Sequence, residues 1–91
     1  MLFRSLIIDD GARRAIKDQG ASLLPVGVTQ VRGDFVAGDV VNVVDSQDVL
    51  LGRGLVRYSS DEMVRVRGLK LDVIARFMPD KDGQPCIHRD E

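Results

Sequence analysis

The chain has 91 residues, with 13 basic and 14 acidic side chains and a formal net charge of −1. A chain of this length buries only about two thirds of its unfolded surface, so residues 1–91 are expected to form a single domain. Balanced charge gives weak support for nucleic-acid binding, because phosphate contacts need a concentrated positive face, and the longest apolar runs fall far short of the ~20 residues that cross a bilayer.

The first predicted elements are a strand and a helix. Residues Phe3 to Ile8 form an apolar, β-branched run that predicts a largely buried strand. Asp9 or Asp10 can accept the free N–H groups of a helix that starts at Gly11, and residues 12, 15 and 16 then place apolar side chains on one side. Gly20 is the natural end of this helix.

Extended segments follow. Residues Ser22 to Val31 predict a strand that bends in the middle, because Pro25 lacks an N–H donor and Gly27 follows closely. Turn residues at 33–34 and 38–39 lead into Val40 to Val44, which predicts a strand buried on both faces or nearly so.

The next strand, Val49 to Tyr58, is expected to pair antiparallel with residues 40–44, because residues 45–48 form a connection of hairpin length. Gly52 and Gly54 leave one face of it bare, which indicates a bulge or the close approach of another segment.

The last elements are two short helices and a closing strand. Ser59 and Glu62 fit a capping box for a helix over residues 60–66, which Gly68 ends. The spacing of apolar residues 69, 73, 74 and 77 predicts a second amphipathic helix that Pro79 terminates, and residues 85–88 predict a closing strand.

No set of residues makes a convincing catalytic or metal site. His88 is the only histidine, and a triad with Ser59 or Ser60 lacks the nucleophile elbow that such a site needs. Cys86, His88 and Asp90 could line one strand face as metal ligands, but the usual paired cysteines or helical histidine spacing is missing. Catalytic and metal-binding residues are therefore expected to be absent.

Two charged groups have simple structural interpretations. Asp9 and Asp10 could act as paired carboxylates, but their position before a helix explains them without catalysis. Arg13, Arg14 and Lys17 lie opposite the apolar side of the first helix, where a solvated face is the ordinary interpretation.

The cellular compartment is indicated by two features. A single cysteine cannot form an internal disulfide, which favours a reducing compartment such as the cytoplasm. The N-terminal apolar run reaches Asp9 and Asp10 before a signal-peptide core could form, so neither secretion nor a membrane location is expected.

Five motifs together resemble one known family. They are IDDGARRAI, SLLPVGV, GDFVAGDVV, RGLVRYSSDE and IHRD, in this order along the chain. They are similar to the PUA domain, in the version found at the C-terminus of glutamate 5-kinase, and the resemblance extends from about Leu6 to Asp90. It implies a mainly β fold with short helices, a PUA-like pseudo-barrel of mostly antiparallel strands.

The resemblance also implies a parent enzyme. Glutamate 5-kinase phosphorylates the side-chain carboxylate of glutamate with ATP and magnesium in proline synthesis, and its catalytic residues belong to a preceding amino-acid kinase domain. Residues 1–91 are then a C-terminal, noncatalytic accessory or regulatory domain without a cofactor of its own. Its expected partner is that kinase domain or its oligomer.

The alternative that the resemblance leaves open is RNA binding. Other PUA domains bind RNA through the first helix, the loop after it and the next strand. On this chain that surface would include Arg13, Arg14, Lys17, Gly20 and Ser22.

Overall fold

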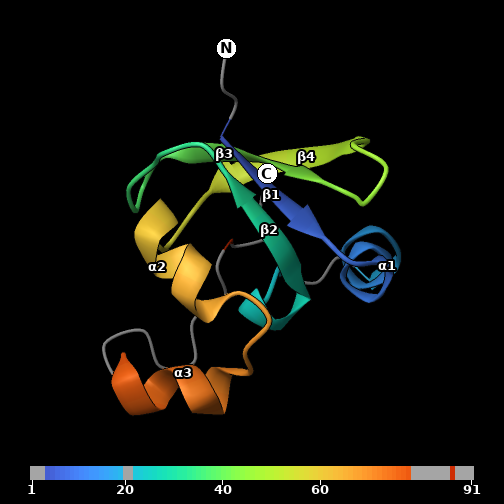
Figure 1. Ribbon diagram of the computed structural model, residues 1–91. Helices are drawn as coiled ribbons and strands as arrows, with labels where there is room; N and C mark the ends of the chain where they lie inside the picture. The colour runs from blue at the N-terminus through green and yellow to red at the C-terminus, as the bar shows by residue number, and fades with distance from the viewer. Residues whose placement is uncertain (1–3, 20–21, 79–86, 88–91) are drawn as a thin grey trace.

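The computed structural model describes residues 4–19, 22–78 and 87 (Figure 1). In chain order its elements are β1 (Ser5–Ile8), α1 (Asp10–Gln19), the 3-10 turn η1 (Pro25–Gly27), β2 (Val28–Arg32), β3 (Val40–Val44), β4 (Leu50–Leu55), α2 (Ser60–Val66) and α3 (Leu71–Phe77).

The described strands form one sheet in the order β2-β1-β3-β4. β1 pairs antiparallel with β2 and parallel with β3, and β3 pairs antiparallel with β4. The predicted fold class, mainly β with short helices and mostly antiparallel strands, is confirmed.

A segment far along the chain brings the two sides of this sheet together. Ile87 forms isolated antiparallel bridges with Leu23, which precedes η1, and with Val56, which follows β4. The Leu23 N–H donates to the Ile87 carbonyl at 3.2 Å. Ile87 is the part of the predicted closing strand that lies among the described residues, and it pairs as that prediction requires.

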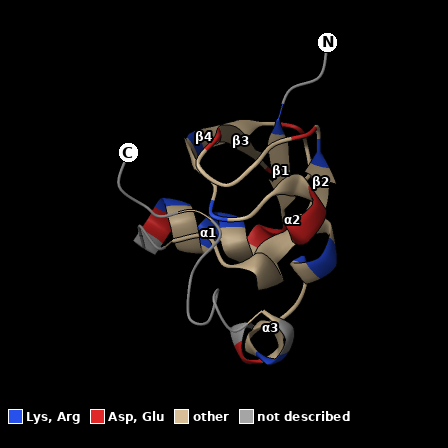
Figure 2. Ribbon diagram, turned by 90° about the vertical axis from the view of Figure 1, so that its left-hand side faces the viewer, with Lys and Arg blue, Asp and Glu red and all other residues tan. Residues whose placement is uncertain are grey.

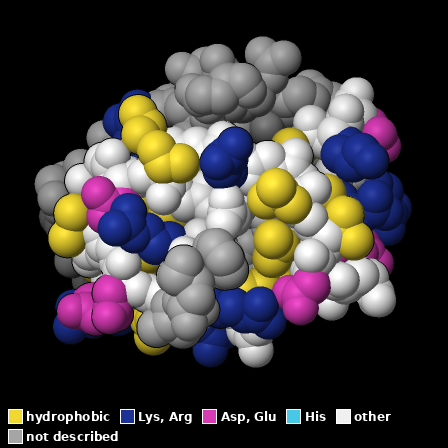
Figure 3. Space-filling model, turned by 90° about the horizontal axis from the view of Figure 1, so that it is seen from above, with side chains coloured by type: hydrophobic (Ala, Val, Ile, Leu, Met, Phe, Trp, Pro, Cys, Tyr) yellow, Lys and Arg dark blue, Asp and Glu magenta, His cyan; other side chains and the backbone are white. Residues whose placement is uncertain are grey.

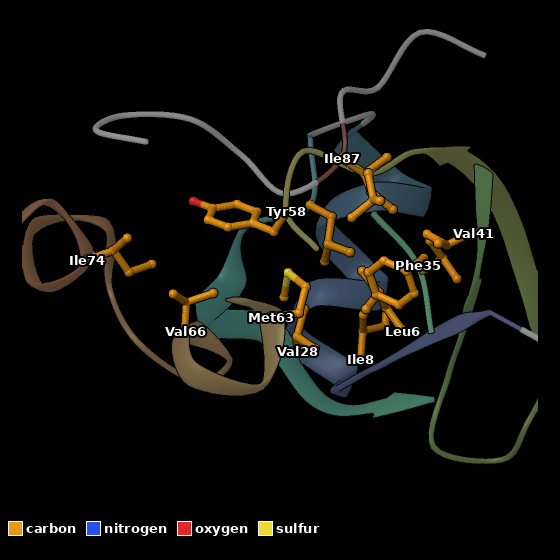
Figure 4. Packing of buried hydrophobic residues seen from close by; sticks show 13 residues of the cluster. Leu6, Ile8, Val28, Phe35, Val41, Tyr58, Met63, Val66, Ile74 and Ile87 are labelled. Carbon is orange, nitrogen blue, oxygen red and sulfur yellow. The ribbon is translucent and has the colours of Figure 1, made fainter. Parts of the chain in front are cut away.

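The hydrophobic core lies between the inner face of the sheet and the helices (Figure 4). Large aliphatic, aromatic and thioether side chains from the strands, loops and helices meet there. Burying one such side chain stabilises the folded state by about 1.5–3 kcal/mol. The fully buried members include Leu6, Ile8, Val28, Val41, Val56, Tyr58, Met63, Val66 and Ile74.

The α2 helix starts at the predicted capping box. The Glu62 N–H donates to Ser59 Oγ at 3.2 Å, and the Ser59 N–H donates to Glu62 Oε1 at 2.9 Å. The Ser60 N–H donates to the Phe35 carbonyl at 2.9 Å, which ties the helix start to the loop before β3. Gly68 follows the helix with φ 78° and permits the chain to turn.

The β3–β4 hairpin agrees with the sequence except at one end. A register shift between Val43 and Val44, opposite Gly52 and Leu50, is the predicted bulge, and a Cβ added to Gly52 would meet nothing within 4 Å. The expectation that residues 40–44 are buried on both faces is wrong at Val40, which is 51% exposed. Val40 points away from the core at the sheet's outer face, where it pairs with Leu55 of the last described strand.

The predicted bend near Pro25 is the 3-10 turn η1, which lies in close contact with the start of α1. A Cβ added to Gly27 would lie 2.5 Å from the Ala12 Cβ of α1. The Gly27 carbonyl accepts the Asp9 N–H at 3.0 Å, and the Pro25 carbonyl accepts the Gly68 N–H at 2.8 Å. One turn therefore holds the start of α1 and the end of α2.

Replacing Gly27 with Ala is expected to destabilise the domain by about 1–3 kcal/mol, because the new methyl group would displace α1. The matched control is Gly52→Ala, where the added Cβ meets open space. Urea unfolding followed by circular dichroism measures both. Equal midpoints for the two variants would contradict the close approach of α1 and η1.

Candidate nucleic-acid interface

Helix α1 is held at its start by Asp9. Its Oδ1 accepts the Ala12 N–H at 2.8 Å, and its backbone carbonyl accepts the Arg13 N–H at 3.0 Å. Asp9 is thus the N-cap of the helix, and its negative charge also lies at the favourable end of the helix dipole. This supports the capping interpretation of the Asp9 and Asp10 pair.

The apolar side of α1 faces the protein. Ala12 and Ile16 are partly buried and pack against the core cluster. Gly27 permits the close contact at Ala12, as described above. The orientation of the helix about its own axis is therefore fixed by these contacts, and its opposite side must face outward.

That outward side carries the three predicted basic residues. Arg14 and Lys17 are exposed, and Arg13 is half-buried. At about 100° per residue, the three positions fall within roughly 100° of the helix circumference. The ion pairs seen between described residues, such as Arg4–Asp39 and Arg32–Asp48, do not involve these three side chains.

Acidic neighbours moderate this positive face. Asp10 precedes Arg14 by four residues, and Asp18 follows it by four, which are the spacings at which helix side chains are neighbours. Three basic and two acidic residues on α1 leave the helix with a formal charge of 3 − 2 = +1. The outward face of α1 is therefore positive, but only weakly so.

The remaining predicted residues are not brought to this face by the described contacts. Gly20 lies outside the described residues. Ser22 is half-buried and stands directly before Leu23, whose backbone bridges to Ile87. The structure therefore gathers Arg13, Arg14 and Lys17 on one helix face and leaves Ser22 beside the closing bridge.

Basic residues around α2 and α3 were not singled out from the sequence (Figure 2). Arg65, Lys70 and Arg76 are exposed. Arg67 has a structural contact, because its guanidinium donates to the Thr29 carbonyl at 2.9 Å. The sequence does indicate a second basic region here, because residues 64–76 include four basic residues and one acidic residue.

Among the described residues, the candidate nucleophile Ser59 has a structural role. Ser59 Oγ is engaged in the capping box. No group of three or more His, Cys, Asp or Glu residues that could hold a metal ion is found in the described part of the chain. Cys86, His88 and Asp90, the weighed metal ligands, lie outside it. None of the described helices has the length and apolar character required to cross a bilayer.

The family follows from comparison with known sequences. The model of the PUA domain matches residues 4–78. The chain belongs to the PUA domain family. This confirms the resemblance that the five motifs indicate, and the matched residues include α1 and all four strands.

The similar curated proteins are glutamate 5-kinases. That of Syntrophus aciditrophicus is 47% identical over 85 residues, which cover 93% of this chain and 22% of the relative. That of Synechococcus sp. strain JA-3-3Ab is 45% identical over 86 residues, covering 94% of this chain and 23% of the relative. The chain thus spans less than a quarter of the length of these relatives and is homologous to their C-terminal PUA domain.

Solved structures of PUA proteins share the fold. A PUA domain from Aeropyrum pernix K1, crystallised in complex with tartrate, has a TM-score of 0.69 at 24% identity and covers 97% of this chain and 42% of that chain. The archaeal box H/ACA sRNP Nop10–Cbf5 complex has a TM-score of 0.65 at 27% identity, covering 72% of this chain and 21% of that chain.

Replacing Asp9 with Ala is expected to cost about 1 kcal/mol of stability, because the Ala12 N–H loses its acceptor. Asp9→Asn is the control, since its side-chain oxygen can still accept this hydrogen bond. Thermal or urea unfolding measures both changes. An equal loss in the two variants would show that the charge of Asp9, rather than its hydrogen bond, holds the helix.

Proposed function

We propose that this chain is the noncatalytic accessory module of a glutamate 5-kinase, carried after an amino-acid kinase domain. The observation that supports this most is the match to glutamate 5-kinases at 45–47% identity over nearly the whole chain but under a quarter of each relative. A segment of this size fits an added domain of the enzyme.

In this proposal the reaction belongs entirely to the preceding domain. That domain binds glutamate, ATP and magnesium, and transfers the phosphate in the cytoplasmic synthesis of proline. The described residues contribute a capped, close-packed scaffold whose Ser59 hydroxyl already has a structural partner. The module acts by packing on the kinase domain or its oligomer and tuning proline inhibition, magnesium dependence or assembly.

Removal of residues 1–91 from the parent enzyme is expected to change at least one of three properties: proline inhibition, magnesium dependence, or oligomeric state. Steady-state kinetics across proline and magnesium concentrations and size-exclusion chromatography with light scattering measure them. The intact parent is the control. If all three are unchanged in the truncated enzyme, this function is wrong.

RNA binding is the second candidate function, and a specific observation favours it. The outward face of α1 presents Arg14 and Lys17 to solvent without an ion pair to any described residue. A similar fold occurs in the archaeal box H/ACA sRNP protein complex, at 27% identity. Together these features support an RNA contact through the outward face of α1, with Arg13, Arg14 and Lys17 as the contacting residues.

The chemistry of this surface favours phosphates over bases. The aromatic side chains that the structure describes, Phe35 and Tyr58, are both buried in the core. Sequence-specific readers of unpaired RNA stack bases on exposed aromatic rings. A helix face of Arg and Lys instead positions a backbone by charge, so the expected RNA is structured and recognised mainly by shape.

The double variant Arg14→Ala/Lys17→Ala is expected to weaken binding to structured RNA and to lower the salt slope of binding by about 2, one for each lost phosphate contact. Arg65→Ala/Lys70→Ala removes the same charge from the α2–α3 side and is the matched control (Figure 1). Fluorescence anisotropy at several salt concentrations measures both. Absence of RNA binding by the unaltered chain at low salt would overturn this function.

A further inference from the structure

Three exposed aliphatic residues lie on β3, on β4 and in the loop that leads into β3. Val36 is 62% exposed, Val40 51% and Leu55 53%. Val40 and Leu55 are direct partners in the β3–β4 register. A turn links Val36 to them, because the Asp39 N–H donates to the Val36 carbonyl at 3.1 Å. Val36, Val40 and Leu55 are named here the outer apolar patch.

The fold itself does not account for the outer apolar patch. The next pair along the same strands, Val41 and Gly54, points inward and is buried, whereas Val40 and Leu55 point outward. The following outward pair is polar, with Asn42 opposite Arg53. Adjacent exposed aliphatic residues with a polar border are typical of a surface that another protein covers.

The chain enters the domain beside this patch. The Asn42 N–H donates to the Arg4 carbonyl at 2.8 Å, and the Arg4 guanidinium lies 3.7 Å from the Asp39 carboxylate. Arg4 therefore contacts Asp39, which directly precedes Val40, and Asn42, which follows Val40 by two residues. A domain attached ahead of Arg4 would be tethered near the patch, and tethering raises its effective concentration there.

The chemistry of the patch distinguishes it from the candidate RNA surface. Its side chains carry no charge, so they offer nothing to a phosphate, and they suit a protein surface that excludes water. Figure 3 looks down onto the β3 and β4 side of the molecule and shows exposed hydrophobic side chains between separate basic ones. Helix α1, which carries the basic face, is a separate element from β3 and β4 (Figure 1).

We propose that the outer apolar patch of Val36, Val40 and Leu55 is the surface on which the preceding amino-acid kinase domain of the parent enzyme docks. This inference rests on the proposed accessory function, since it names the partner as the part of a glutamate 5-kinase that lies outside this chain. The curated relatives are more than four times as long as the segment they share with it, so such a partner is large.

Site-specific thiol labelling tests the docking. Leu55→Cys is introduced into the full-length parent and into the 91-residue chain, and maleimide modification at position 55 is followed by mass spectrometry. Labelling is expected to be about tenfold slower or more in the parent, which corresponds to ~1.4 kcal/mol of docking free energy. Val40→Cys repeats the measurement on the neighbouring strand.

The matched control is Val64→Cys in α2, which starts from a similar exposure of 56% and lies outside the patch. Its labelling rate is expected to be the same in both proteins. Equal rates at positions 55 and 40 in the parent and in the short chain would overturn the docking surface. Slowing in the short chain as its concentration rises would indicate a second copy on the patch and would also overturn it.

These outcomes are separate from a failure of the accessory function. That function is tested by removing the whole module and measuring kinetics and assembly, which does not depend on Leu55. Altered regulation after removal, combined with unprotected cysteines at 55 and 40, would keep the function and reject this surface.

Discussion

The arrangement of this domain depends on the three-residue turn η1. Its Gly27 carbonyl accepts the Asp9 N–H at the start of α1, and its Pro25 carbonyl accepts the Gly68 N–H just after α2. Gly27 also brings the turn so close to Ala12 that no Cβ fits between them. Two helices from distant parts of the chain are thereby tied to the turn that directly precedes β2, and α2 packs against β2 itself.

This constraint separates two surfaces with different chemistry. Because Ala12 and Ile16 are held against the core, Arg14 and Lys17 must face solvent on the other side of α1. The outer apolar patch belongs to β3 and β4, near the point where Arg4 leads into the sheet. A module built in this way can pack on an attached domain through one surface and keep a weakly basic helix face available to a second partner.

Local chemistry made much of the fold predictable from the sequence. The Ser59–Glu62 capping box, the break at Pro25 and the antiparallel β3–β4 hairpin depend on residues close together in the chain, and all are present. The cationic face of α1 also follows from helical periodicity, because the apolar positions fix which side is outward.

Features that depend on distant segments were not predictable in the same way. The parallel pairing of β1 with β3 joins strands separated by more than thirty residues. The exposure of Val40 depends on what covers the outer face of the sheet, and a run of valines alone cannot show that. Likewise, the outer apolar patch becomes visible only when the register places Leu55 opposite Val40.

Native-state hydrogen exchange at the amides of Asp9 and Gly68 tests most directly whether the turn holds the domain together. Both amides donate to carbonyls of η1, at 3.0 Å and 2.8 Å. If the turn is the central constraint, the opening free energy at both amides should equal the free energy of global unfolding. The same is expected of the Val56 amide, which follows β4 and donates to the Asp39 carbonyl. Rapid exchange at Asp9 and Gly68 while Val56 stays protected would show that the helices open independently of the sheet, and would contradict this account.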